Sequence, residues 1–240
     1  MNYINKISKL FKLVKNKIWF KGLINNIAAN IELENLIENL EFDTVFDIGS
    51  NKGQFILLLE KKFPNKLIHS FDPLKENIEK QKKFFKNYKN IFFYTFGIGI
   101  QNEKKEFFIT KRRDSSSFLK VTENINNDYN IVEKRIVLIK SLDEIIKMTN
   151  FPKNILVKID VQGFELNVLH SGKDVLNKIK YIIIEVSDKI LYENQALSND
   201  IIQFLKKKNF SIHRESLPNK IYKTDIIQKD ILFVNNSSID

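Results

Sequence analysis

Two short apolar runs, each closing on an aspartate, constrain the fold of this chain most strongly. The first, residues 45–48, contains Asp47 and leads directly into a loop that holds glycines at positions 49 and 53. The second, residues 67–71, is followed at once by Asp72. A glycine loop after a strand, with carboxylates at the strand ends, is typical of nucleoside-type cofactor sites on α/β sheets. The pair therefore predicts a sheet with a ligand site at its strand ends.

The hydrophobic pattern beyond residue 43 alternates between strand-like and helix-like segments. The predicted strands are residues 44–48, 67–71, 91–96, 155–160, 181–186, 210–214 and 230–234, and the predicted helices lie near 53–62, 75–86 and 164–178. Such alternation favours βαβ units and a mostly parallel sheet. Right-handed crossovers then place the carboxyl ends of the strands along one edge, where ligands bind.

One stretch between the third and fourth strands breaks this rhythm. Residues 106–110 and 135–139 are strand-like and flank the polar loop 111–134. We expect an inserted β-hairpin there, beside the site, because loops of this length are commonly functional. Ser141 stands three residues before Glu144, a spacing that predicts the capped start of a helix.

Composition and charge exclude several classes of protein. The 240 residues are 43% hydrophobic, which is enough for one sizeable domain with a full core. The absence of cysteine rules out disulfides, zinc–thiolate clusters and a cysteine nucleophile. Residues 1–31 hold six lysines and no acid, so of the net charge of +10 only 10 − 6 = +4 belongs to the remaining chain. A nucleic-acid partner is therefore not favoured.

Residues 1–40 are expected to form a basic, helical extension to a domain spanning residues 41–240. Apolar residues recur at helical spacing along its first half, at Ile4, Ile7, Leu10, Phe11, Val14 and Ile18. A cationic amphipathic helix can lie on an anionic membrane, dock on its own domain or contact a second subunit, and these alternatives stay open. Lysines interrupt the apolar run, so neither a membrane span nor a secretory signal is expected. We expect a cytoplasmic protein, with peripheral membrane contact through residues 1–20 as one alternative.

The charges around the glycine loop indicate which cofactor it holds. Gly49 and Gly53 give a GxxxG spacing, which differs from the GxGxxG of dinucleotide sites. Asp47 feeds this loop and would repel a diphosphate, but it suits a ligand that carries an ammonium and a sulfonium. S-adenosyl-L-methionine is such a ligand. Asp72 then stands where a carboxylate can accept hydrogen bonds from both ribose hydroxyls.

Several segments together resemble the FkbM family of S-adenosylmethionine-dependent methyltransferases. They are residues 46–53 (FDIGSNKG), Phe71-Asp72-Pro73 with Asn77, and residues 158–165 (KIDVQGFE). The resemblance covers roughly residues 43–190. It implies the class I methyltransferase fold, α/β and Rossmann-like, with a seven-stranded, mostly parallel sheet whose last strand, residues 230–234, runs antiparallel.

The resemblance also implies roles for individual residues. The loop from Asp47 to Gly53 would hold the methionyl part, Asp72 the ribose, and residues 96–98 would lie along the adenine. The full predicted cofactor set is Asp47, Gly49, Ser50, Asn51, Gly53, Phe71, Asp72, Pro73, Asn77, Gly97, Ile98 and Asp160. Two features depart from the family: Asp72 stands where Glu is commoner, and residues 97–101 lack the acid that usually follows the third strand.

Methyl transfer to a hydroxyl needs a positioned acceptor and a general base, because the hydroxyl pKa is high. Asp160 ends the apolar run 155–159 and is the first candidate for the base. Glu165 either meets the substrate or only complements a helix dipole. Glu185 ends another strand and is the third candidate. Lys158 either binds substrate or pairs with an acid.

The remaining candidates are weaker. The run Ser115-Ser116-Ser117 matches a serine pair of the family. We expect it to touch the acceptor or the cofactor, with Ser115 and Ser116 as the substrate candidates, unless these are simply polar loop residues. His69 and His213 fall inside strands and are expected to be structural. Asp160, Glu165 and Glu185 could converge on a divalent ion, but no metal is expected.

The sequence thus predicts an S-adenosylmethionine-dependent O-methyltransferase. The expected acceptor is a hydroxyl of a saccharide, such as a surface glycan, or of a related metabolite. An RNA-binding protein or RNA methyltransferase is one alternative, and a non-catalytic scaffold that docks on a membrane or partner is another. A homo-oligomer also stays open.

Overall fold

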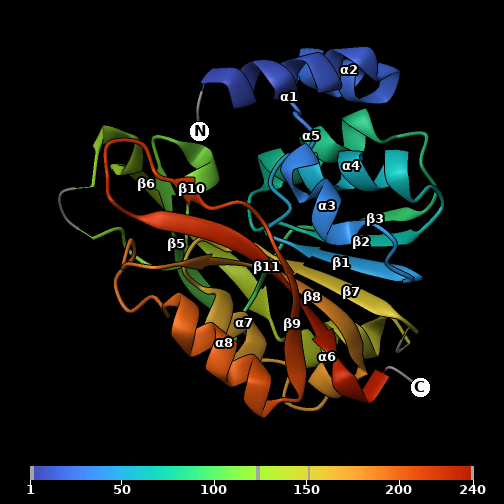
Figure 1. Cartoon of the computed structure of the whole chain (residues 1–240). Helices are drawn as coiled ribbons and strands as arrows, with labels where there is room; N and C mark the ends of the chain where they lie inside the picture. The colour runs from blue at the N-terminus through green and yellow to red at the C-terminus, as the bar shows by residue number, and fades with distance from the viewer. Residues whose placement is uncertain (1–2, 123–124, 151, 239–240) are drawn as a thin grey trace.

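The computed structural model describes residues 3–122, 125–150 and 152–238, and it is built around one twisted central sheet (Figure 1). Its strands are β1 (Thr44–Ile48), β2 (Leu67–Phe71), β3 (Ile91–Tyr94), β7 (Ile155–Ile159), β8 (Ile179–Ser187), β9 (Phe210–Glu215), β10 (Asn219–Lys220) and β11 (Ile227–Asn235). They follow the order β10-β11-β8-β7-β1-β2-β3, with β9 pairing on β11.

The strand directions confirm the predicted class I arrangement. The four pairs β1–β2, β2–β3, β1–β7 and β7–β8 are parallel, whereas β11 runs antiparallel to both β8 and β9. The seven predicted strands are all present. The short β10 adds an eighth, because the chain before β11 turns back and pairs with it at Asn219 and Lys220.

Helices cover both faces of the sheet and bury a core under each (Figure 1). Helices α4 (Gln54–Lys62) and α5 (Lys75–Phe84) lie on one face, and α6 (Leu142–Met148), α7 (Glu165–His170) and α8 (Ser198–Lys207) lie on the other. The strands are buried along nearly their whole length in the middle of the sheet, β1 and β7 at every position. This explains why they read as continuous apolar runs in the sequence.

Helix α7 ends earlier than the predicted segment 164–178. It stops at His170, and the chain continues through Ser171 and Gly172 to a short 3₁₀ turn at Leu176–Lys178. The Ser171 hydroxyl donates to the Val168 carbonyl at 2.6 Å and accepts from the Leu142 amide at 3.0 Å. The end of α7 is thus tied to the start of α6, a tertiary contact that helical periodicity does not reveal.

The predicted insertion is a separate three-stranded sheet. Strands β5 (Glu103–Thr110) and β6 (Ile131–Lys140) form the expected antiparallel hairpin, and β4 (Gly97–Ile98) pairs parallel to β6. The helix predicted after it begins as expected, with the Ser141 side chain accepting from the Glu144 amide at 3.2 Å. In a capping box the Glu144 side chain would accept from the Ser141 amide. Here the Ser141 amide donates instead to Asn102 Oδ1 at 3.1 Å.

The N-terminal segment docks on its own domain. Helices α1 (Tyr3–Lys15) and α2 (Lys17–Ile24) form an outer layer above α4 and α5 (Figure 1). The chain then passes through the 3₁₀ turn Ile31–Leu33 and α3 (Glu34–Ile37), which lies closer to β1. The buried Trp19 donates its indole N–H to the Leu57 carbonyl in α4 at 3.1 Å. Leu13 and Trp19 share one hydrophobic cluster with α4. The side chains of Ile4 and Ile7, two members of the predicted apolar stripe, lie outside the described part.

Across the described ranges, none of the helices has the length and apolar character that crossing a membrane requires.

Candidate active site

The glycine loop predicted after the first strand turns tightly around the end of β1. Gly49 has φ +78°, and a Cβ there would lie 1.9 Å from the Asp160 carbonyl oxygen. The amides of Gly49 and Ser50 both donate to the Phe71 carbonyl at 3.0 Å. A side chain at position 49 would therefore push the loop away from the ends of β2 and β7.

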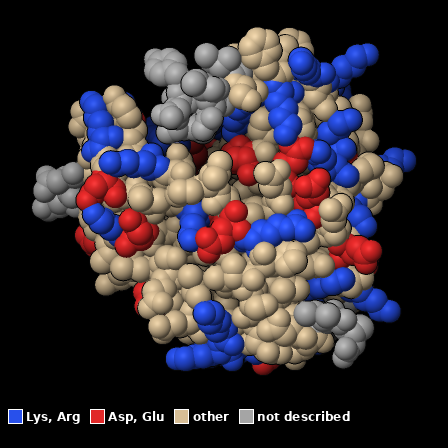
Figure 2. Space-filling model, in the orientation of Figure 1, with Lys and Arg blue, Asp and Glu red and all other residues tan. Residues whose placement is uncertain are grey.

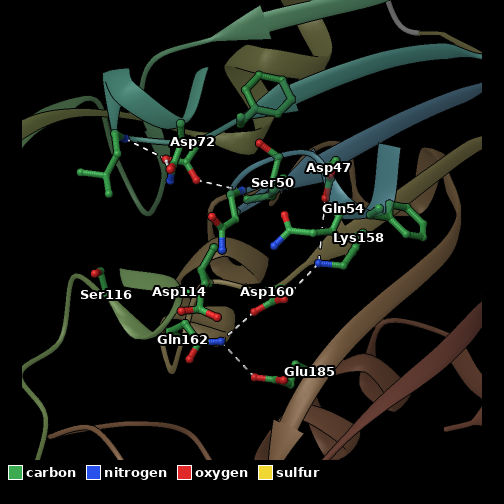
Figure 3. Close-up of a pocket in the computed structure, with 18 of the residues that line it drawn as sticks. Asp47, Ser50, Gln54, Asp72, Asp114, Ser116, Lys158, Asp160, Gln162 and Glu185 are labelled. Carbon is green, nitrogen blue, oxygen red and sulfur yellow. Dashed lines mark hydrogen bonds and ion pairs between the residues drawn. The ribbon is translucent and has the colours of Figure 1, made fainter. Parts of the chain in front are cut away.

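Asp72, immediately after β2, is held by three N–H donors. Its Oδ1 accepts from the Leu74 amide at 2.8 Å and from the Asn77 side chain at 3.0 Å, and its Oδ2 accepts from the Asn51 amide at 2.9 Å (Figure 3). Burial raises the pKa of this carboxyl to about 7, while the three donors act in the opposite direction. A carboxylate has about four acceptor positions, so one is left for a ligand hydroxyl.

Asp47 is fully buried in β1 opposite Lys158 in β7. The two residues are register partners, and Oδ1 of Asp47 lies 4.0 Å from the Lys158 ammonium nitrogen. Neither carboxylate oxygen of Asp47 accepts a hydrogen bond from any residue that the structure describes. Burial raises the pKa of Asp47 to about 6, and the Lys158 charge opposes this rise. Asp47 is thus a buried acceptor that fits an added cation.

Lys158 pairs with acids, which was one of its two predicted roles. Its ammonium also donates to Asp160 Oδ2 at 3.1 Å. Burial lowers its pKa, but the charges of Asp160 and Asp47 outweigh burial and hold the pKa above its ordinary value. Lys158 therefore links the two aspartates as a permanent cation.

Asp160, Gln162 and Glu185 form a second polar group at the ends of β7 and β8 (Figure 3). The Gln162 amide nitrogen donates to Asp160 Oδ1 at 2.8 Å and to Glu185 Oε2 at 3.2 Å. The side-chain oxygen of Gln162, Oε1, lies 3.0 Å from the buried Tyr192 hydroxyl, which shares its single proton between this oxygen and the Ser115 backbone carbonyl. Burial and the neighbouring Asp160 and Asp230 charges hold the pKa of Glu185 well above its ordinary range. Gln162 therefore holds two of the predicted catalytic acids side by side.

Glu165 is placed differently from the other two acids predicted to be catalytic. Its Oε1 accepts from the amides of Val161 and Gly163, both at 3.1 Å, and its side chain does not reach the cavity. Burial raises its pKa to about 7, against the effect of these donors. Its observed contacts shape the loop that carries Asp160 and Gln162, so the predicted substrate contact does not fit this placement.

The two predicted serines are adjacent in the insertion but make different contacts. Ser116 lines the cavity, and its hydroxyl accepts from the Thr110 amide at 3.1 Å. Ser115 is buried beside the cavity, and its backbone carbonyl accepts from the Tyr192 hydroxyl at 2.9 Å. Ser117, the last residue of this run, donates to the backbone carbonyl of Gln162 at 2.7 Å. The serine run thus braces the loop that carries Gln162.

A cavity of about 380 Å³ brings most of the predicted residues together. The predicted residues that line it are Asp47, Gly49, Ser50, Asn51, Phe71, Asp72, Pro73, Asn77, Gly97, Ile98, Ser116, Lys158, Asp160 and Glu185. Gly53 does not line it: with φ +88° it is the N-cap of α4, packed against Phe85.

Several lining residues were missed by sequence reasoning. They are Lys9, Asn30 and Glu32 from the N-terminal segment, Gln54 from α4, Arg112, Arg113 and Asp114 from the insertion, and Gln162. Gln54 and Gln162 stand within or next to the quoted motifs and could have been weighed. The others reach the cavity only through tertiary packing, and nothing in their local sequence marks them.

The residues present fit S-adenosyl-L-methionine. Asp47 offers two buried carboxylate oxygens without hydrogen-bond donors, and Asp72 keeps acceptor capacity at the neighbouring strand end. The glycine loop between them leaves no room for a side chain at position 49. Within the described ranges, no three histidine, aspartate or glutamate side chains are placed to hold a metal ion.

The fold and the site define a class I methyltransferase. The Methyltransferase FkbM domain family matches residues 47–212, and the chain belongs to this family.

A curated relative and two solved structures show similarity to this chain. Hexuronic acid methyltransferase AglP of Haloferax volcanii is 24% identical over 192 residues, which cover 75% of this chain and 73% of AglP. Magnesium protoporphyrin IX methyltransferase of Synechocystis, solved with bound S-adenosylmethionine, aligns with a TM-score of 0.50 at 11% identity over 96% of this chain and 91% of its own. Sp1610 of Streptococcus pneumoniae, in complex with S-adenosyl-L-methionine, aligns with a TM-score of 0.51 at 10% identity, over 86% of this chain and 73% of its own.

Proposed function

We propose that this chain transfers a methyl group from S-adenosyl-L-methionine to a hydroxyl of a saccharide. The observation that carries the proposal is the pair of buried carboxylates, Asp47 and Asp72, that line one cavity from neighbouring parallel strands. The cofactor supplies a methyl group already activated on a sulfonium. The protein has to bind its two polar ends, hold the acceptor in line and exclude water.

The cofactor side of the cavity follows from charge. Asp47 binds the ammonium of the methionyl part, since that cation satisfies carboxylate oxygens that have no other donor. Asp72 accepts from a ribose hydroxyl at its remaining acceptor position, while its three N–H donors hold it in place. Gly97 and Ile98 line the wall where the adenine would lie.

The acceptor side is formed by Asp160, Gln162 and Glu185 together with Ser116 from the insertion. Asp160 serves as the general base, because 28% of its side chain is exposed and Gln162 and Lys158 fix its orientation. Glu185 and Gln162 hold neighbouring hydroxyls of the acceptor. Closely spaced carboxylates and amides suit a polyhydroxylated ring, and the similarity to a hexuronic acid methyltransferase supports a sugar substrate.

Charge argues against RNA as the acceptor. The cavity is lined by six acids, Glu32, Asp47, Asp72, Asp114, Asp160 and Glu185, against four bases, Lys9, Arg112, Arg113 and Lys158. Three of these basic residues, Lys9, Arg112 and Lys158, are themselves paired with cavity acids. A phosphodiester backbone would therefore find no excess of positive charge at this site.

The cofactor assignment is tested by calorimetric titration with S-adenosyl-L-methionine. Asp72→Ala should weaken binding at least tenfold, because it removes the ribose acceptor and leaves three donors without a partner. Asp174→Ala is the matched control, since the Asp174 side chain is 70% exposed and, among the residues that the structure describes, pairs with Lys147 at 3.5 Å. Equal affinity in the wild type and Asp72→Ala would refute the assignment of the ribose carboxylate.

The acceptor is tested in the cell and then in vitro. Mass spectrometry of the host's surface glycans, with and without the gene, should show the loss of one methyl group. Transfer of labelled methyl to the isolated unmethylated glycan should restore it. A methyl ether survives mild alkali whereas a methyl ester is hydrolysed, so an alkali-labile product would overturn the choice of a hydroxyl. Cofactor binding without a labelled glycan would favour a different acceptor or a non-catalytic scaffold.

A further inference from the structure

The outer side of helices α1 and α2 combines exposed apolar side chains with unscreened positive charge. Five large apolar residues are exposed there, Leu10, Phe11, Val14, Phe20 and Ile24, with Phe11 at 64% and Ile24 at 65%. Leu10 and Val14 stand four residues apart, as do Phe20 and Ile24, so each helix presents a stripe on one side. We define these five residues as the α1–α2 apolar face.

The opposite side of the same helices packs against α4. Trp19 is bonded to the Leu57 carbonyl, and a Cβ on Gly22 would come within 2.2 Å of the Leu57 side chain. Between the two helices, Asn16 is the N-cap of α2, and its side chain accepts from the amides of Ile18 and Trp19. The α1–α2 apolar face therefore cannot be buried by turning the helices over.

Lysines surround this face. Lys15, Lys17 and Lys21 are exposed, and residues 1–31 contain no acid that could neutralise them within the segment. Lys9 and Lys12 instead turn inward to Glu32 and Glu34. Figure 2 shows basic side chains interspersed with uncharged ones along the upper part of the molecule, where these helices lie.

A groove beside the face has the same mixed character. Its volume is about 220 Å³, and it is lined by Lys17, Ile18 and Lys21 of α2 and by Phe84 and Tyr88 at the end of α5. The Lys21 ammonium lies 5.9 Å from the centre of the Phe84 ring. Aromatic rings beside lysines are typical of the headgroup level of a membrane.

We infer that the α1–α2 apolar face binds an anionic lipid surface. The apolar side chains enter the interface, and Lys15, Lys17 and Lys21 contact the phosphate layer. Nucleic acid would use the lysines but leave the apolar residues in water, and a neutral protein partner would not use the lysines. An anionic lipid surface uses both features. The contact holds α1, whose Lys9 lines the active-site cavity, against the membrane.

The experiment is sedimentation of the full chain with vesicles of phosphatidylcholine alone and of phosphatidylcholine with 30% phosphatidylglycerol. The wild type should bind the anionic vesicles at least tenfold more strongly and should lose binding as salt rises. Lys15→Gln, Lys17→Gln and Lys21→Gln together should lower partitioning about a hundredfold, since each lysine near the surface is worth roughly a factor of five. Phe11→Ser with Ile24→Ser should abolish it.

Two matched controls use the same chemistry elsewhere on the protein. Val132→Ser with Ile136→Ser removes two apolar side chains, both 63% exposed, from β6. Lys206→Gln, Lys207→Gln and Lys208→Gln remove three exposed lysines at the end of α8. Both controls should bind vesicles like the wild type. All variants should keep the wild type's affinity for S-adenosyl-L-methionine. Vesicle binding is measured separately from cofactor binding, so its result stands whether or not the cofactor proposal fails.

Three results would overturn the inference. The first is a wild type that does not sediment with anionic vesicles, and the second is equal loss in the control variants. The third is evidence that the α1–α2 apolar face has another partner. RNA binding that is lost in the lysine variant but kept in Phe11→Ser with Ile24→Ser would be such evidence. A dimer in solution that this double variant dissociates would be another.

Discussion

At the scale of single residues, the two acids Asp160 and Glu165 differ in what their carboxyl groups touch. Asp160 faces the cavity between Lys158 and Gln162, whereas Glu165 accepts two backbone amides of its own loop. Both follow β7 within six residues, and the sequence ranked Asp160 first as the base but left a substrate contact open for Glu165. The difference comes from the loop, in which Gln162 and Gly163 adopt positive φ and turn the chain back.

This difference predicts opposite outcomes for two conservative variants. With the unmethylated glycan as substrate, Asp160→Asn should lower kcat by about 10²–10⁴-fold, the usual contribution of a general base. Glu165→Gln keeps an oxygen acceptor for Val161 and Gly163, so its kcat should stay within about threefold of the wild type. The measurement is steady-state kinetics with labelled cofactor. A similar loss in both variants would contradict the assignment of the base.

His69 is a buried imidazole that the cavity does not use. It lies in β2, 5% exposed, stacked against Phe46 and Phe92, and its Nδ1 lies 3.0 Å from the Tyr94 hydroxyl. Burial lowers its pKa to about 4 from an ordinary 6.5. Its predicted structural role therefore has a consequence for stability: between these two pH values the unfolded chain binds a proton that the folded chain does not.

The free energy of unfolding should accordingly contain a His69 contribution that falls on acidification. Its slope is about 1.4 kcal/mol per pH unit as pH drops from 6.5 towards 4. His69→Phe keeps the stacked ring and should remove this slope from urea titrations at pH 7, 6 and 5. His213→Gln, at an exposed position of β9, should keep it. Identical pH profiles for His69→Phe and the wild type would show that His69 is protonated in the folded state.

At the scale of elements, the glycine loop between β1 and α4 depends on one position. Gly49→Ala places a Cβ where the Asp160 carbonyl lies and forces a side chain into φ +78°. The strain, about 1–3 kcal/mol, should be relieved by loop displacement, with at least a tenfold loss of affinity for S-adenosyl-L-methionine. Gly172→Ala meets only the side chains of Leu142 and Leu176 and should leave that affinity unchanged. Calorimetry on both variants separates local strain from a general effect of the added methyl.

The elements of this fold differ in how far their sequence predicts them. Strands such as β1 and β7 are buried throughout, so a continuous apolar run marks them clearly. The β5–β6 hairpin was predicted because its apolar strands flank a polar loop. The end of α7 was not, since a hydroxyl bonded to a distant helix start decides it. β10 escaped prediction because two exposed residues, Asn219 and Lys220, carry no apolar signal.

At the scale of the whole molecule, the cavity is assembled from three separate parts of the chain. The strand ends supply the acids that motifs identify, the insertion supplies Arg112, Asp114 and Ser116, and the N-terminal segment supplies Lys9, Asn30 and Glu32. Motifs locate the first part because strand and loop carry their own spacing. The other two are brought to the cavity by packing between distant segments, which depends on burial of residues such as Trp19.

Trp19 therefore couples the stability of the N-terminal layer to the cavity. The indole is 3% exposed and donates to the Leu57 carbonyl. Further along the same segment, the Asn30 backbone amide donates to the Gln54 carbonyl in α4 at 3.2 Å. Trp19→Ala should cost about 3–5 kcal/mol of unfolding free energy and also weaken cofactor binding, as the layer loosens from α4. Phe20→Ala, at a neighbouring position that is 43% exposed, should change neither by much. Urea titration and calorimetry check both variants, and a Trp19→Ala protein that keeps full stability would show that α1 and α2 sit on the domain without supporting it.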